Sequence, residues 1–209
     1  MGALEGSLSF KTYYVEGEPP NDFHADYLSR IQRRFFQPLS PIGDEERSMG
    51  WVPVQDPLAV SAQRHDIFFN QYILLALRID KWSIPSAWLK AIMRQALAER
   101  FPDKNIKISK RAKEEVRLQV VTDIKHKILP AMKTVDLVWN ISERRLRFWS
   151  TSNALCEEFA EFFEETFGLR LTPDSPYMMA KNLGLSDADL NRMLSIEPWY
   201  PGLTHQDSM

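Results

Sequence analysis

Alternating hydrophobic and polar positions predict the strands of this 209-residue chain. Apolar or aromatic side chains alternate with polar ones over residues 8–14, the pattern of a strand with one buried face. Residues 67–69 and 72–80 predict two strands around an Asn-Gln turn, and the second is rich enough in Ile and Leu to lie centrally in a sheet. Residues 135–148 predict a hairpin with its turn at Ser-Glu-Arg, and residues 169–171 predict a short strand.

Hydrophobic residues at helical spacing predict five helices between and after these strands. Their starts are marked by capping or turn residues at Asp22, Ser86, Ser109, Ser152 and Ser186. Prolines close the two long middle helices, at Pro102 and Pro130, and Gly168 closes the helix that follows. The element order is then β-α-β-β-α-α-β-β-α-β-α, which predicts the α+β class with antiparallel sheets.

Four prolines between residues 38 and 60 predict an irregular connection, in which Gly50 makes a turn and Trp51 fills the core. The chain divides into three expected parts. Residues 1–84 and 134–180 form a central sheet domain, residues 85–133 form a protruding helical tip, and residues 181–209 form an acidic C-terminal segment.

Composition indicates a globular chain, because 44% of the residues are hydrophobic and 11% are aromatic. One cysteine, Cys156, allows no intramolecular disulfide and favours a reducing cytoplasm. The first ten residues lack the basic and apolar regions of a signal peptide, and the longest apolar run, residues 73–77, is far too short to cross a bilayer. We therefore expect a cytoplasmic protein with no membrane partner.

Charge is distributed unevenly along the chain, although the formal net charge is only −2. Residues 81–149 hold 16 Lys/Arg against 7 Asp/Glu, whereas residues 150–209 hold 3 against 10 and residues 1–80 hold 7 against 11. A basic block of this kind is typical of a surface that binds a polyanion. It is equally typical of helices whose lysines only face water, and charge alone leaves both interpretations open.

Catalytic and cofactor motifs are missing from the sequence. His24, His65, His126 and His205 are scattered, with no HExxH pair and no Cys/His cluster, so we expect no metal. With 8 glycines and no phosphate-binding loop motif, we expect no nucleotide cofactor. Cys156 is expected to be a buried structural thiol. The Glu residues between 157 and 165 follow one helix face and lack the layout of a nuclease site. We expect no enzymatic activity.

Candidate DNA contacts fall into two groups. The first consists of long cationic side chains on the two middle helices and their loop, suited to phosphate contacts without base recognition. These are Lys90, Arg94, Lys104, Lys107, Lys110, Arg111, Lys113, Arg117 and Lys125. They do not form one stripe, because Arg111 and Lys113 point well apart on a helix.

The second group lies on the return strand of the hairpin, where Arg145, Arg147 and Trp149 share a face. Such a strand can hold a nucleic-acid backbone and stack on a base. The alternative for Trp149 is that it packs beneath a neighbouring helix. Met132, which follows Pro130 at the helix exit, is either a core residue or an exposed contact for a partner subunit.

Several sequence blocks, taken in order, resemble the recombination-associated protein RdgC family of bacteria. They are MGWVP at 49–53, the strand pair leading to IPS at 84–86, the Lys-rich helix with its exit at 128–130, the strand at 137–141 and FGL at 167–169. The resemblance covers about residues 6–180 and is carried by the order of the blocks more than by any one of them.

This resemblance implies a horseshoe-like subunit that dimerises into a ring around duplex DNA and restrains RecA-driven recombination. In that family the tips of two subunits meet through an apolar residue after the L-P exit, which corresponds to Met132 here. The basic inner surface corresponds to the cations of residues 90–127 and to Arg145 and Arg147. Members of the family are longer, and the part absent here closes the ring, so an open clamp or another oligomer is expected.

The leading hypothesis is therefore a non-catalytic, nucleoid-associated protein that binds duplex DNA by its phosphates, as a homodimer and with RecA or another recombination protein as a possible partner. The alternative is a protein-interaction module that has lost DNA binding. Its acidic C-terminal segment would then recruit a basic partner or mask the basic middle of the chain.

Overall fold

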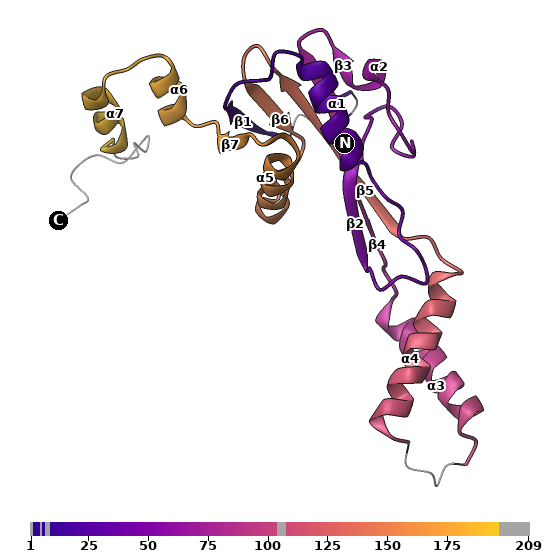
Figure 1. The fold of residues 1–209 in the computed structure, drawn as a ribbon. Coiled ribbons are helices and arrows are strands. Elements are labelled where there is room, and N and C mark those ends of the chain that lie inside the picture. The colour runs from indigo at the N-terminus through magenta and orange to yellow at the C-terminus, as the bar shows by residue number, and fades with distance from the viewer. Residues whose placement is uncertain (1, 5, 7–8, 104–107, 197–209) are drawn as a thin grey trace, which may run out of the picture.

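A computed structural model describes residues 2–4, 6, 9–103 and 108–196. Within these ranges an antiparallel sheet curls into a half-barrel, and a pair of helices projects from one end of it as an arm (Figure 1). A second, smaller pair of helices lies beyond the opposite side of the sheet. Lys104 and Lys107, both predicted DNA contacts, lie outside the described residues.

The sheet contains seven strands within the described ranges, and all of them pair antiparallel. Its main path runs β2-β4-β5-β6-β1-β7, and β3 pairs with β4 off this path. The strands are β1 (Lys11–Glu16), β2 (Arg47–Val52), β3 (Phe68–Phe69), β4 (Tyr72–Lys81), β5 (Ala131–Asn140), β6 (Arg145–Phe148) and β7 (Arg170–Pro173).

Two helices, α1 (Phe23–Arg33) and α5 (Asn153–Phe167), cover one face of this sheet and close an aromatic core. Trp139 of β5 packs between them, with ring centroids 5.3 Å from Tyr27 and 5.3 Å from Phe163. The alternation of strand side chains sends every second residue into this core. Residues of the intervening register point to the opposite face of the sheet.

Some local signals for helix ends are confirmed, but Ser152 precedes α5 without a side-chain cap hydrogen bond, and the helix expected to be closed by Pro130 ends at Lys125. Asp22 accepts a hydrogen bond from the Ala25 amide at 3.2 Å, as an N-cap does. Gly168 ends α5 in the left-handed conformation, with φ of 69°, where glycine has no Cβ penalty. A short helix, α2 (Arg64–Ile67), precedes β3 and was not predicted.

The arm consists of α3 (Ser86–Arg100) and α4 (Lys110–Lys125), joined to the ends of β4 and β5. Ser109 caps α4 by accepting from the Ala112 amide at 3.2 Å. Val116, Val120 and Ile124 are buried against half-buried apolar residues of α3, and this small cluster is separate from the main core. The arm is therefore stabilised chiefly by contacts between its own two helices.

The C-terminal pair consists of α6 (Pro176–Asn182) and α7 (Asp187–Leu194). The sequence predicted only the second of these, whose Ser186 accepts from the Asp189 amide at 3.3 Å. Leu183, Leu194 and Ile196 of this region are largely exposed, at 78%, 69% and 74%. The pair thus leaves apolar surface uncovered within the described residues.

The prediction for residues 38–60 was partly wrong, because this stretch contains β2. Gly50 does not make a turn but lies within β2, opposite Arg78 of β4. A Cβ at this position would overlap the Phe36 backbone, which runs alongside. Trp51 is fully buried, as predicted, and its Nε1 donates to Thr166 Oγ1 at 3.0 Å.

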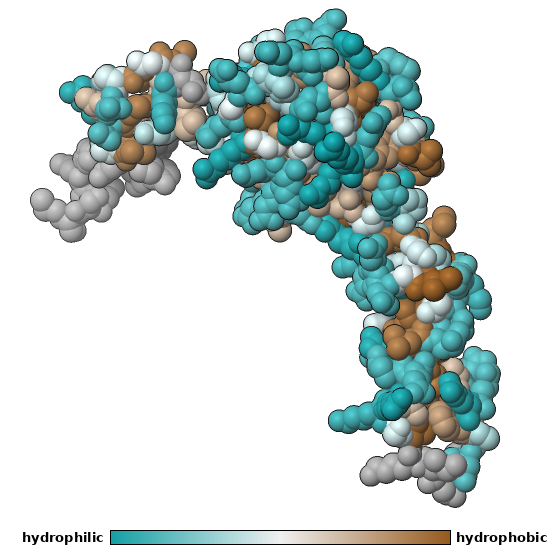
Figure 2. Space-filling view, in the orientation of Figure 1, coloured by the Kyte–Doolittle hydropathy of each residue, from teal (hydrophilic) through white to brown (hydrophobic). Residues whose placement is uncertain are grey.

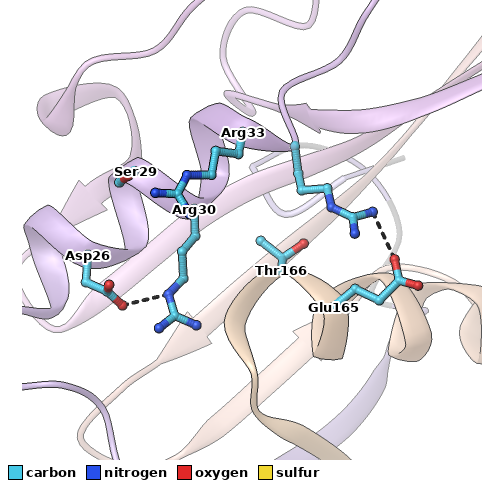
Figure 3. Close-up of a pocket in the computed structure, with 7 residues that line it drawn as sticks. Asp26, Ser29, Arg30, Arg33, Glu165 and Thr166 are labelled. Atoms are coloured by element: carbon cyan, nitrogen blue, oxygen red, sulfur yellow. Dashed lines mark hydrogen bonds and ion pairs between the residues drawn. The ribbon is translucent and has the colours of Figure 1, made fainter.

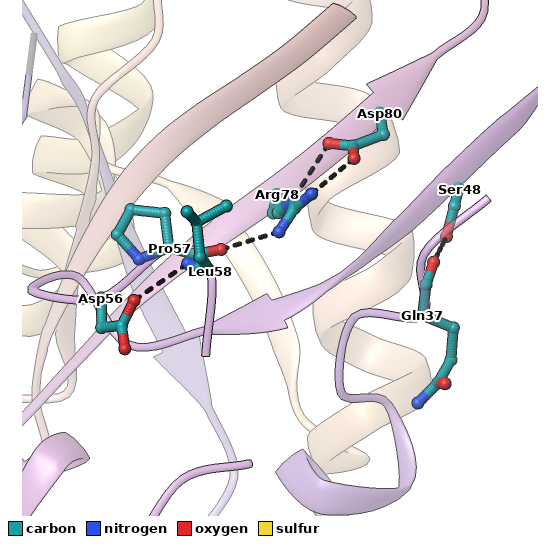
Figure 4. Close-up of polar contacts among 7 residues, drawn as sticks. All are labelled: Gln37, Ser48, Asp56, Pro57, Leu58, Arg78 and Asp80. Carbon is teal, nitrogen blue, oxygen red and sulfur yellow. Dashed lines mark hydrogen bonds and ion pairs between the residues drawn. The ribbon is translucent and has the colours of Figure 1, made fainter. Parts of the chain in front are cut away.

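A buried ion pair fixes the loop after β2 to the sheet (Figure 4). Arg78 Nε donates to Asp80 Oδ1 at 2.9 Å, and Arg78 Nη2 donates to Asp80 Oδ2 at 2.6 Å. The third nitrogen of the guanidinium donates to the Pro57 carbonyl at 3.0 Å, and the group lies 4.0 Å from the centroid of the Phe36 ring. This single side chain joins the loop at 56–58, the Phe36 segment and β4.

The α+β class and the antiparallel sheet are thus confirmed, and the predicted helical tip is the arm. None of the described helices is long and apolar enough to span a membrane.

Candidate nucleic-acid interface

Seven of the predicted cations lie on the arm and are spread along its length. Lys90 and Arg94 are one helical turn apart on α3, and both are exposed. On α4, the helical repeat places Lys110, Lys113 and Arg117 on one flank and Arg111 on the other. Since α3 leaves the sheet and α4 returns to it, Lys90 lies near the base of the arm, and Lys110 lies near its free end.

Some of these cations are neutralised within the arm itself. Arg111 Nε lies 3.3 Å from Glu115, and Arg117 Nη1 lies 3.5 Å from Glu114, both within a single helix. Four of the predicted contacts are exposed and make no ion pair with a described residue: Lys90, Arg94, Lys110 and Lys113. These four have their full charge available to an anionic ligand.

Lys125 is placed differently from the other predicted contacts. Its side chain is buried, at 8% exposed, with Nζ 3.4 Å from the Gly43 carbonyl and 5.7 Å from the centre of the Trp82 ring. A buried ammonium cannot reach a phosphate outside, so the prediction that Lys125 contacts DNA is corrected. Position on a helical wheel could not reveal this, because the cover comes from residues 43 and 82.

The second predicted group lies on the sheet, away from the arm, on the face opposite α1 and α5. Arg145 Nη2 is 3.9 Å from Asp174 Oδ2, and the Arg147 guanidinium lies 5.5 Å from the Phe10 ring centre. Trp149 is half-buried, with its ring centroid 5.1 Å from that of Phe10. Its described ring partner is Phe10 of the N-terminal segment, and Trp149 also packs against the edge of the main core cluster.

The predicted cations do not gather on one surface. β5 separates the base of the arm from the β6 arginines, and its ten residues span about 30 Å in an extended strand. The molecule has an arch-like outline, in which the arm and the sheet lie on the two sides of a bend (Figure 2). We therefore treat the arm cations and the sheet arginines as two candidate interfaces.

Acidic side chains of α5 make the inner side of the bend unfavourable for a polyanion, on the sheet face opposite Arg145 and Arg147. α5 lies on the inner side of the bend, between the arm and the C-terminal helices. Glu158 pairs with Arg47 of β2, and Glu165 pairs with Arg34 at 2.9 Å. Glu157, Glu161 and Glu164 are exposed on the same helix. Their negative charge disfavours a polyanion at the middle of the bend and leaves the arm as the more favourable site.

A cluster of arginines that sequence reasoning missed lines a cavity of about 280 Å³ between α1 and α5 (Figure 3). Arg30 Nε lies 2.7 Å from Asp26, and its Nη1 donates to the Phe167 carbonyl at 2.8 Å. With Arg34 bound to Glu165, two of the three arginines here already have carboxylate partners. We interpret the cluster as a connection between the two helices and the C-terminal end of α5.

Met132 is exposed rather than part of the core. Its side chain is 49% exposed at the start of β5, close in sequence to Leu129, which is 90% exposed. Trp88, near the start of α3 and therefore also near the base of the arm, is 47% exposed. Large apolar groups thus accompany the basic residues of the arm.

Other chemistry is sparse in the described part of the chain. No group of three or more His, Cys, Asp or Glu residues there is arranged to hold a metal ion. Cys156 is buried, as predicted, and its Sγ lies 3.5 Å from the Ser150 carbonyl. Burial, with a contribution from the Cys156 thiol, raises the pKa of Tyr13 well above its ordinary value.

A scan against protein-family models finds no match to this chain, and a search of curated proteins finds none either.

Proposed function

We propose that the protein binds DNA without sequence preference, through contacts between phosphates and the cations of the arm. The observation that carries this proposal is a set of four exposed cations, Lys90, Arg94, Lys110 and Lys113, that make no ion pair with a described residue and lie on an element that projects from the body. Residues 82–130 hold 11 Lys/Arg against 5 Asp/Glu, a local charge of +6. Flexible cations of this kind bind phosphates and do not read bases.

The direct test replaces the four cations together by glutamate and measures duplex binding by fluorescence anisotropy at low salt. The matched control replaces four exposed cations elsewhere, Arg33, Arg64, Arg170 and Lys181, and so makes the same change in net charge. We expect the arm variant to lose binding and the control to keep most of it. Equal losses in both variants would show that net charge alone is responsible, and would contradict a site on the arm.

The resemblance to the RdgC family extends this proposal to a homodimer or open clamp, with Met132 at the contact, that modulates RecA-dependent recombination or replication in the nucleoid. Support comes from the exposed position of Met132 beside Leu129 at the base of the arm. Light scattering of Met132→Glu tests the contact: a dimeric wild type should become monomeric. Met179→Glu, at a comparably exposed methionine on α6, should leave the mass unchanged.

A second candidate, a protein-interaction module, is favoured by the exposed apolar residues of the C-terminal pair of helices. Deletion of residues 182–209 separates the two cases. Loss of a partner protein with unchanged DNA binding supports the module. Stronger DNA binding supports masking of the arm by this acidic segment.

A further inference from the structure

Aromatic side chains form a row across the sheet on the face opposite α1 and α5. The strand register places Phe69, Tyr72, Asn140, Arg145 and Tyr14 in direct succession over β3, β4, β5, β6 and β1. Paired residues of an antiparallel sheet point to the same side, and neighbouring strands are about 4.8 Å apart. The row therefore extends over about 19 Å from the first strand to the last.

Two further rows run parallel to this one. In the next, Leu74, Val138, Arg147 and Thr12 are paired in succession, so the second arginine lies one row from the first. Beyond it, Trp149 packs on Phe10 at 5.1 Å, and the Arg147 guanidinium lies over the same Phe10 ring. One face thus carries five aromatic residues and two arginines that come from distant parts of the sequence.

This face is accessible to a ligand. Phe69 and Tyr72 are 39% and 37% exposed, which is unusual for two rings side by side on a sheet. The strand side chains that face the core pack against α1 and α5, whereas these exposed rings point to the other face and are not part of the main core. Residues 2–3 lie on the same face but nearer the arm, where the Ala3 amide donates to Asp136 Oδ2 at 2.7 Å. Asn140 of the first row is four residues further along β5, so this contact does not cover the row.

We propose that this aromatic face binds an unpaired polynucleotide strand. Exposed aromatic rings stack on bases, but a duplex hides the base faces inside its own stack, so such a surface selects single strands. Arg147 makes no carboxylate ion pair with a described residue and is available to a phosphate or to a base plane. The face is distinct from the arm and does not depend on the duplex binding proposed there.

Local charge determines how this binding should respond to salt. Glu143 borders the same shallow depression as Arg145 and Arg147, and Asp174 partly neutralises Arg145. Stacking must therefore supply most of the affinity. With at most two cations involved, the log–log dependence of the strand affinity on salt should be no steeper than about −1.4, which is about −0.7 for each phosphate contact on a single strand.

The test measures anisotropy of labelled oligothymidylate and oligouridylate, which do not pair with themselves, alongside a labelled duplex. Tyr72→Ala and Arg147→Ser should each weaken strand binding, and together by about tenfold, the effect expected for loss of one stacked base. Tyr72→Phe keeps the ring and should retain the affinity. Trp88→Ala, at an exposed aromatic residue of the arm, is the matched control and should have no effect on strand binding.

The tighter of the two strands identifies the natural ligand as DNA or RNA, and either result supports the proposal. Absence of strand binding by the wild type at low salt would overturn it. So would unchanged affinity in both face variants, or loss of strand binding in the arm variant alone. Because the duplex is measured in parallel, failure of the arm to bind DNA would be visible as a separate result.

Discussion

At the scale of single residues, Gly50 shows how one missing side chain permits a strand to form. The Phe36 backbone runs so close to β2 that a Cβ on Gly50 would overlap its Cα and N atoms, and backbone cannot move as the end of a side chain can. We expect Gly50→Ala to lower the free energy of unfolding by about 3 kcal/mol, as overpacking against rigid atoms does. Urea denaturation measures this change.

Gly43→Ala serves as the control for that substitution. The nearest atoms to a Cβ on Gly43 are 3.5 Å away, which is an ordinary contact distance. Its effect on stability should stay within about 0.5 kcal/mol. A similar stability for both variants would mean that the Phe36 segment does not lie against β2.

Tyr27 predicts how stability depends on alkaline pH. Burial raises the pKa of Tyr27 to about 12, against an ordinary value of 10.0. Between these values the unfolded chain has lost this proton and the folded chain has kept it, so the free energy of unfolding falls as pH rises. The loss is up to about 1.4 kcal/mol for each pH unit in this window.

The thermal melting midpoint should therefore decrease steadily from pH 9 to 12. In Tyr27→Phe this decrease per pH unit should be smaller. Some slope should persist, because burial also raises the pKa of Tyr13. The described residues offer no hydrogen-bond partner to the Tyr27 hydroxyl, so its removal should cost little stability at pH 7. An unchanged slope in Tyr27→Phe would contradict the assignment.

At the scale of elements, the Arg78–Asp80 pair joins β4 to two loops. Asp80→Ala leaves the guanidinium, whose side chain is only 12% exposed, without its carboxylate, and should cost about 3 kcal/mol of stability. The double variant Arg78→Met/Asp80→Leu removes both charges and should recover most of that loss. A double variant as unstable as the single one would show that the pair contributes through its hydrogen bond to Pro57 instead.

The arm should open independently of the sheet. Among the described residues of the arm, only Val116, Val120 and Ile124 are buried between its helices, whereas the main core has its own aromatic cluster. Val120→Ala should destabilise this contact by about 2 kcal/mol. Hydrogen exchange should then accelerate throughout α3 and α4, while β4 and β5 outside the arm keep the protection of the wild type. Uniform acceleration over the whole chain would contradict a separate unit.

Elements with local signals could be predicted from the sequence. α1 and α4 have side-chain caps, α3 begins directly after Pro85, and each has apolar positions at helical spacing within its own segment. β2 could not be predicted, because it depends on pairing with β4 and on contact with Phe36, both distant in the sequence. α6 was missed because its seven residues make only two turns, too few to show a helical repeat of apolar positions.

The candidate interfaces were likewise predictable where they depend on one helix or strand, and not where they depend on contacts between distant residues. Helical spacing correctly indicated that Arg111 and Lys113 diverge, since this is a property of one helix. The burial of Lys125 by Gly43 and Trp82 is a tertiary effect with no local signal. Likewise, the aromatic row requires the register of five strands, of which the sequence predicts the alternation but not the pairing.

At the scale of the whole molecule, the basic arm and the aromatic sheet face are separate surfaces, and acidic α5 lies on the other face of the sheet, on the inner side of the bend. A chain with a net charge of −2 can in this way present a locally cationic element to a polyanion. It also predicts that duplex and unpaired strand bind at different places. Saturating oligothymidylate should therefore leave the duplex affinity within about twofold, whereas overlapping sites would give full competition.

The salt dependence of duplex binding tests the central claim most directly. With Lys90, Arg94, Lys110 and Lys113 each neutralising one phosphate, the plot of log affinity against log salt should have a slope at least as steep as about −3.6, at about −0.9 for each contact. The variant with glutamate at all four positions should show no such dependence. A wild-type duplex affinity that does not change with salt, or the absence of any binding at low salt, would contradict a DNA-binding arm.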